Sequence, residues 1–326
     1  MKSQIYSALF LFFIAMAMIH PAQAQQNQMF LAPYDNLKPL VLMEDLEYPF
    51  EVKYAQLESG PSIAYVDEGE GDVIIFIHGL GSYLPAWRKN IDSLKTLYRC
   101  IAIDLPGYGK SSKTPHSGKM TYYASVLKEF IETLGLNKVT LAGHSMGGQI
   151  SMVAAINYPN LIQNIVLVAP AGFESFTEGQ KQWFRNVMTL DGVKNTPAED
   201  IQTNLAVNFY NMPADAEFMI TDRLNMRHAA DFENYCYAVV QSVNGMVDEP
   251  VLGMLHKISQ PTLIIFGAND NLIPNRFLNP GRTSKIAENG HKLIKDSKLV
   301  MIKQAGHFVQ FEKPEEVNNA INDFLK

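Results

Sequence analysis

The sequence predicts an α/β fold, in which a mostly parallel central sheet carries helices on both faces and a helical cap is inserted. The first observation is that continuous apolar runs, as at 73–77, alternate along the chain with segments of helical periodicity. A run without polar alternation is typical of a strand buried on both faces, and strand–helix alternation indicates parallel strands. The second observation is that the alternation stops after residue 170 and resumes at 261–266. We therefore expect a core at residues 50–170 and 260–326, and a cap at 171–259.

Length and composition fit one large domain with an insertion. The chain has 326 residues, of which 47% are hydrophobic and 18% are charged, an ordinary globular balance. Its net charge of −6, without a run of Lys or Arg, argues against a nucleic-acid partner. These properties leave the oligomeric state open.

The first 24 residues have the pattern of a signal peptide. Lys2 precedes an apolar stretch at 5–19, and Ala22-Gln23-Ala24 matches an A-x-A cleavage site. The apolar stretch is shorter than the about 20 residues of a membrane-spanning helix, and an uncleaved anchor is the alternative. We predict cleavage before Gln25 and export to a periplasm or the outside, without stable membrane association afterwards.

The remaining elements follow in order. Residues 25–49 are polar and contain several prolines, which predicts a lead-in that wraps the surface. Apolar and amphipathic patterns then predict strands at 50–57, 62–66, 73–77, 98–103, 139–142 and 165–168, with helices at 84–97, 120–134 and 151–156. After the cap they predict strands at 261–266 and 299–302, a short helix after Thr283 and a last helix at 314–325.

The centre of the predicted core is a G-x-S-x-G pattern formed by Gly143, Ser145 and Gly147. An apolar, β-branched run precedes it and a helical pattern follows it, so the serine lies at a sharp strand-to-helix turn. Such a turn needs neighbours without large side chains, which the glycines supply. The helix N-terminus directs free N–H groups to the place where an oxyanion would form. An ordinary tight turn is the alternative interpretation.

A serine nucleophile needs a base and an orienting carboxylate, which follow later strands in the order Ser, acid, His. Asp270 follows the strand at 261–266, and His307 follows the strand at 299–302. The carboxyl ends of parallel strands meet at one edge of the sheet, where all three residues would converge. A turn aspartate and a surface histidine are the structural alternatives, and Asp248 is the second candidate for the acid.

Two backbone N–H groups would hold an oxyanion, those of Met146 and Leu80. His144 and Phe308 flank the serine and the histidine, and we expect them to contact substrate. The cap is rich in Met and aromatic residues, most of which should pack rather than bind. From the cap we select Trp183, Phe184 and Met188 as pocket candidates. No metal-ligand spacing or glycine-rich phosphate loop is present in the sequence, so no cofactor is implied.

The mature chain contains two cysteines, Cys100 and Cys236. Export would permit a disulfide between them, but two cysteines do not make a disulfide framework. Cys100 lies in an apolar run typical of a buried strand. We favour two buried free thiols.

These motifs together resemble the α/β-hydrolase fold superfamily over residues 50–325. The resemblance rests on His78-Gly79, the run Asp104-Leu105-Pro106-Gly107-Tyr108-Gly109-Lys110-Ser111, the Ser145 turn, Asp270 and Gly306-His307. Within the superfamily the chain is similar to capped esterases and carbon–carbon-bond hydrolases. Dehalogenases and epoxide hydrolases of this fold carry Asp in place of Ser145, which argues against both chemistries.

The residues at three places in the sequence favour ester cleavage over carbon–carbon cleavage. The resemblance implies Asn before the nucleophile, a Gly/Pro-rich oxyanion loop and Trp after the histidine in the carbon–carbon hydrolases. This chain has His144, Leu80-Gly81-Ser82-Tyr83 and Phe308 there. We therefore predict a serine hydrolase that cleaves small to medium apolar carboxylic esters through an acyl-enzyme. Carbon–carbon hydrolysis on the same triad and non-catalytic binding of a small molecule are the alternatives.

Overall fold

The computed structural model describes residues 37–326 and contains one eight-stranded sheet. The predicted signal peptide, with its cleavage site, lies outside the described residues and stays a prediction. The strands are β1 (Lys53–Gln56), β2 (Ser62–Glu68), β3 (Val73–Ile77), β4 (Arg99–Ile103), β5 (Val139–His144), β6 (Ile162–Val168), β7 (Thr262–Gly267) and β8 (Ser297–Ile302). Their order in space is β1-β2-β4-β3-β5-β6-β7-β8. All pairs from β4 to β8 are parallel, and β2 is antiparallel to both of its neighbours, which confirms the mostly parallel sheet.

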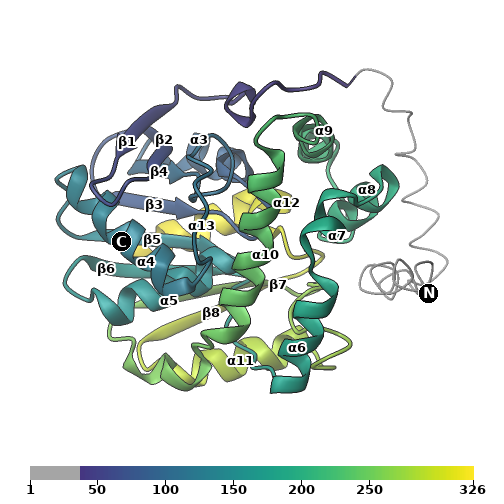
Figure 1. Ribbon diagram of the computed structural model, residues 1–326. Coiled ribbons are helices and arrows are strands. Elements are labelled where there is room, and N and C mark those ends of the chain that lie inside the picture. Colours follow the sequence, from purple (N-terminus) through teal and green to yellow (C-terminus); the bar gives the residue numbers. More distant parts are fainter. Residues whose placement is uncertain (1–36) are drawn as a thin grey trace.

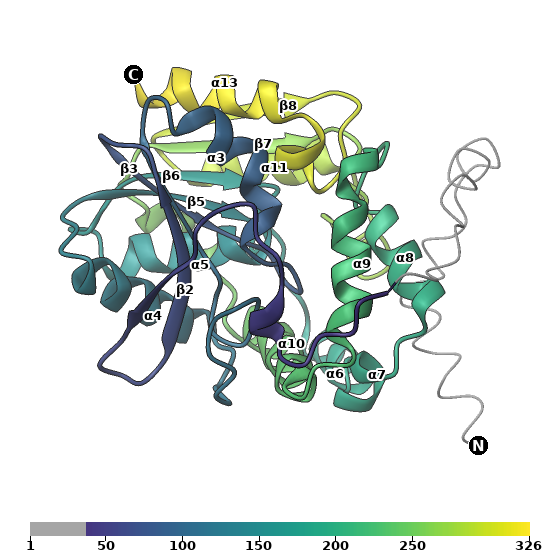
Figure 2. The same cartoon turned by 90° about the horizontal axis from the view of Figure 1, so that it is seen from above.

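Helices cover both faces of this sheet, as predicted. They are α3 (Arg88–Leu94), α4 (Met120–Thr133), α5 (Met146–Asn157), α11 (Thr283–Leu293), α12 (Val309–Glu312) and α13 (Pro314–Leu325). Along β3, Ile75 and Ile77 pack in one apolar cluster with α4, α5 and α11, while Ile74 and Phe76 pack in a second cluster with α3 and α13. Figure 2 shows α13 and α4 on opposite sides of the sheet. Alternate side chains of each central strand therefore fill two different cores.

All the regular secondary structure between β6 and β7 is helical. It contains α6 (Glu178–Val187), α7 (Leu190–Lys194), α8 (Ala198–Ala206), α9 (Glu217–Met226), α10 (Phe232–Asp248) and the short 3-10 helices η4 (Ala214–Ala216) and η5 (Leu252–Lys257). Figures 1 and 2 show α6, α7, α8 and α9 together beside the sheet. The far part of this cap has its own apolar cluster, which includes Phe209 and Met219 and extends to Phe308 and Phe311 of the core. The cap is therefore packed directly on the segment that follows β8.

Residues 37–49, the described part of the predicted lead-in, contact both the core and the cap. Met43 and Leu46 are buried in the main core. The Lys38 amide donates to the Asn225 side chain of the cap (2.9 Å), and the Met43 amide donates to Asp231 (3.0 Å). On the core side, the Tyr48 hydroxyl donates to Asp104 (2.6 Å). This segment therefore ties the cap to the core, a contact between distant parts of the chain that its polar composition does not reveal.

The two cysteines can be compared with the prediction made for them. Cys100 and Cys236 are both free and buried, which confirms the prediction for the thiols. Burial raises the pKa of the Cys100 thiol to about 12 and that of Cys236 to about 11, so neither is a reactive thiolate at neutral pH. Among residues 37–326, no helix has both the length and the apolar character that crossing a membrane requires.

Candidate active site

Ser145 occupies the sharp turn between β5 and α5, in a backbone conformation that side chains rarely adopt. Its φ is 52° and its ψ is −117°. The turn is tightly enclosed, since a Cβ on Gly143 would lie 2.2 Å from the Gly147 carbonyl oxygen, and one on Gly147 would lie 2.3 Å from that of Ile77. Only glycine fits at both positions. The strained turn therefore places the Ser145 side chain at the end of β5, at the edge of the sheet.

His307 and Asp270 are brought together from the loops after β8 and β7. The His307 Nδ1 lies 2.8 Å from Asp270 Oδ2, and both residues are buried. Asp270 Oδ1 accepts the amides of Leu272 (2.8 Å) and Ile273 (3.1 Å), so the carboxylate cannot turn away. A proton on Nδ1 that is held by this carboxylate leaves Nε2 with a lone pair. His307 can therefore act as a base whose orientation is fixed by Asp270.

Asp248, the second candidate for the acid, has a different partner. It is the last residue of α10 and forms an ion pair with Arg185 of α6 at 2.5 Å. Both side chains are about one-third exposed, at 39% and 34%. The structure therefore pairs Asp248 with a surface arginine of the cap, and it pairs Asp270 with His307.

The loop after β3 lies against Ser145. A Cβ on Gly79 would be 3.1 Å from the Ser145 Cβ, which shows how closely the two backbones approach. His78 holds this loop, because its Nδ1 donates to the Gly79 carbonyl (2.8 Å) and its Nε2 accepts the Leu105 amide (3.0 Å). Burial lowers the pKa of His78, which favours the neutral ring that this pattern needs.

Neither predicted oxyanion donor is used elsewhere in the part of the chain that the structure describes. Within residues 37–326, the amides of Leu80 and Met146 have no hydrogen-bond acceptor. Met146 is the first residue of α5, where the helix dipole adds positive potential. Both groups are therefore available to an oxygen next to Ser145.

His144 lies beside His307 and supports it. Its Nε2 donates to the His307 carbonyl (3.0 Å), and the two rings are 4.8 Å apart. Burial, and then the neighbouring His307, lower the pKa of His144 well below its usual range, so it stays neutral. A side chain committed to the His307 backbone is not the base for Ser145.

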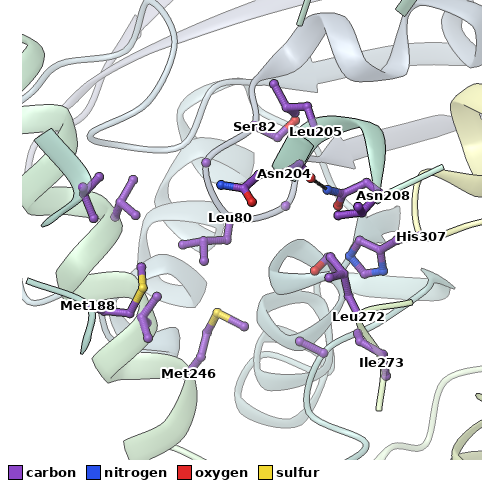
Figure 3. Close-up of a pocket in the computed structure, with 18 of the residues that line it drawn as sticks. Leu80, Ser82, Met188, Asn204, Leu205, Asn208, Met246, Leu272, Ile273 and His307 are labelled. Carbon is purple, nitrogen blue, oxygen red and sulfur yellow. Dashed lines mark hydrogen bonds between the residues drawn. The ribbon is translucent and has the colours of Figure 1, made fainter. Parts of the chain in front are cut away.

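A cavity of about 380 Å³ connects these residues with the cap. Ser145, His307, Leu80 and His144 line it on the core side, and Phe184, Met188 and Phe308 line it as expected. Figure 3 shows Leu80, Met188, Met246 and His307 around this space. Trp183 is not part of the lining; it packs against the Phe184 ring, with centroids 5.4 Å apart. The structure therefore places Phe184 on the cavity and its neighbour Trp183 behind it, and substrate contact by Trp183 stays a prediction.

Sequence reasoning missed several polar side chains of the cavity, among them those of Asn204, Asn208 and Arg223. The Nη1 of Arg223 is buried and has no hydrogen-bond partner among residues 37–326. Its guanidinium lies 4.5 Å above the centre of the Tyr235 ring, and Nη2 approaches Gly81 of the loop beside Ser145. Burial lowers the pKa of Arg223, while Cys236, Tyr108 and Tyr83 act in the opposite direction. No motif marks these residues, since Asn204 and Arg223 are polar residues of ordinary cap helices and Asn208 lies in the turn after α8.

The described residues contain no group of three His, Cys, Asp or Glu side chains that could hold a metal ion.

The family described as alpha/beta hydrolase fold matches residues 72–314. A 2-hydroxy-6-oxononadienedioate/2-hydroxy-6-oxononatrienedioate hydrolase of Paraburkholderia phymatum is 28% identical over 287 residues, which cover 82% of this chain and 93% of that protein. A probable hydrolytic enzyme from Pseudomonas aeruginosa has a similar structure, with a TM-score of 0.78, 24% identity, and coverage of 88% of this chain and 99% of the other. An esterase from Exiguobacterium antarcticum has a TM-score of 0.71 and 22% identity, with 84% and 99% covered.

Proposed function

The chain belongs to the alpha/beta hydrolase family, and from this membership we propose that it is a serine hydrolase that cleaves carboxylic esters through an acyl-enzyme. The observation that carries the proposal is the hydrogen bond of 2.8 Å between His307 and Asp270, in a cavity that Ser145 also lines. Serine, oriented histidine and carboxylate are the groups that nucleophilic acyl transfer needs.

In the proposed reaction, Ser145 Oγ attacks the ester carbonyl while His307 Nε2 takes its proton. The amides of Leu80 and Met146 hold the oxygen that becomes negative. His307 then gives the proton to the leaving alcohol, and Asp270 stabilises the imidazolium in between. Water repeats the sequence on the acyl-enzyme and releases the acid, with His307 again as base and then as acid.

We expect catalytic efficiency to depend on acyl chain length. The cavity of about 380 Å³ is lined largely by apolar side chains such as Met188 and Met246. Each buried methylene contributes about 0.8 kcal/mol, or about a fourfold gain in kcat/KM, until the cavity is full. A series of p-nitrophenyl esters of rising acyl length should therefore show a maximum, with long triacylglycerols as poor substrates.

A variant pair tests whether this cavity sets the maximum. Met188→Ala enlarges the cavity and should move the maximum to a longer chain. Met254→Ala makes the same change at a partly buried position outside the cavity lining and should leave the maximum in place. An unchanged profile in Met188→Ala would show that substrate binds elsewhere.

Carbon–carbon hydrolysis is the second candidate function, and Arg223 is the observation that favours it. A buried guanidinium without an anionic partner is costly, and a substrate carboxylate would supply that partner. The relative from Paraburkholderia phymatum is named for dioate substrates, which carry two carboxylates. In this reaction water cleaves the carbon–carbon bond next to a carbonyl group. The carbonyl carbon gains OH and becomes a carboxylic acid, and the other carbon of the broken bond gains H.

Arg223→Gln distinguishes the two candidate functions. If substrates are anionic, loss of the charge-assisted contact should lower kcat/KM for a carboxylate-bearing substrate by roughly ten- to a hundredfold more than for a neutral ester. Arg185→Gln makes the same change in the cap at a partly exposed side chain outside the cavity lining, and it should affect both substrates alike. Cleavage of vinylogous diketone acids in preference to any ester would favour the carbon–carbon reaction. Equal losses on neutral and anionic substrates in Arg223→Gln would remove the argument for it.

A further inference from the structure

The carboxylate of Glu312 lies between the cap and the loop that carries His307. Glu312 is the last residue of α12. Its Oε2 accepts the amide of Gly306 (2.7 Å), the residue before His307. The same carboxylate accepts two amides of the cap, Tyr210 at Oε2 (3.1 Å) and Asn211 at Oε1 (2.6 Å). One carboxylate thus receives three N–H groups from two segments that are almost a hundred residues apart in sequence.

A second set of contacts joins the same two segments on the other side of His307. The Phe308 amide donates to the Asn208 carbonyl of the cap (3.1 Å). The rings of Phe209 and Phe308 are stacked, with centroids 5.3 Å apart and planes at 17°. A Cβ on Gly306 would lie 2.5 Å from the Asn208 oxygen, so the two backbones are in direct contact. Phe308 is therefore hydrogen-bonded to the cap segment 208–211, and the Gly306 backbone is in direct contact with it.

The same cap segment also reaches the substrate cavity. Val207 and Asn208 line it together with His307 and Phe308, and Figure 3 shows Asn208 and His307 on the same side of the space. A displacement of residues 208–211 would move the backbone on both sides of the imidazole. A shift of about 1 Å in a reacting group can lower a rate by about 10²-fold.

From these contacts we propose that Glu312 is a positioning residue that docks the cap on the His307 loop, so that the base is aligned with Ser145 only while the cap is in place. This inference rests on the proposed role of His307 as the base. The two possible roles of the cap predict different effects of removing it. A cap that only shaped the pocket would alter substrate preference, whereas a cap that positions His307 also controls the reactivity of Ser145.

The ionised form of Glu312 is the form that can accept all three amides. Burial raises the pKa of Glu312, while its three N–H partners and the neighbouring Lys313 act in the opposite direction. Two further charged side chains pack around α12. Lys89 of α3 donates to the Phe311 carbonyl (3.3 Å) and is paired with Asp215 of the cap at 2.9 Å, and Arg88 lies 5.3 Å from the centre of the Phe311 ring. Since burial disfavours the charge, the three N–H contacts are what stabilise the ionised carboxylate between the cap and the His307 loop.

The test uses the full-length protein and measures covalent labelling of Ser145 by a fluorophosphonate, together with kcat, KM and thermal unfolding. Glu312→Gln should slow labelling and kcat about tenfold with a smaller change in KM, and Glu312→Ala about 10²-fold. Glu315→Gln removes the same charge at an exposed position three residues away and should label like the wild type. Labelling of Glu312→Gln at the wild-type rate would overturn the inference. Absence of labelling in the wild type would instead remove the proposed function on which it rests.

Discussion

Replacement of Ser145 by Ala should abolish ester turnover, with a loss of about 10⁴-fold or more in kcat, because it removes the hydroxyl that would form the acyl-enzyme beside His307. The alanine keeps the backbone conformation of the turn, where φ is 52°, and adds no atom to it. The folded structure should therefore persist, with a thermal unfolding midpoint close to that of the wild type. Steady-state hydrolysis of a p-nitrophenyl ester and fluorophosphonate labelling with intact-mass detection measure the two effects.

Ser151→Ala is the matched control for this prediction. Ser151 is a buried serine in α5 whose hydroxyl donates to the Gly147 carbonyl (2.7 Å), so its loss affects packing without touching the cavity. It should retain labelling at Ser145. Wild-type turnover in Ser145→Ala would disprove the nucleophile assignment. A wild-type protein that binds ester analogues tightly and never releases product would point to a non-catalytic binder.

Asp270→Asn should lower kcat by about 10⁴-fold, because an amide would favour the wrong tautomer of His307 and would not stabilise its protonated form. The amide oxygen of Asn can still accept from Leu272 and Ile273, so the loop should keep its shape. The expected phenotype is therefore a large loss of kcat with a small change in stability.

Asp248→Asn serves as the control for the acid. Its ion pair with Arg185 is partly exposed, and such pairs contribute about 0–1 kcal/mol to stability. We expect turnover near the wild-type value. A large loss in Asp248→Asn with normal activity in Asp270→Asn would transfer the role of the acid to the cap and contradict the assignment made from the His307 contact.

The sequence alone determined the arrangement of the core, because the signals that define it are local. Apolar runs at 73–77 and 139–142 predict buried strands without reference to any partner. Gly143, Ser145 and Gly147 predict a tight turn from their own stereochemistry. In a parallel sheet the strand ends meet at one edge, so the convergence of the loops bearing Ser145, Asp270 and His307 followed from their positions after strands.

The tertiary structure decided which polar groups meet. Asp270 and Asp248 were both candidates for the acid in the sequence. The choice between them depends on which carboxylate packs beside His307. Arg223 and Glu312 carry no motif, and the short helix α12 that ends at Glu312 was not expected between the histidine and the last helix. Their importance lies in contacts with Tyr235, Gly306 and the cap, which only packing between distant segments creates. Local patterns specify the conformation of a segment, whereas the partner of a buried charge is set by how whole segments fit together, and that fit is absent from any single stretch of sequence.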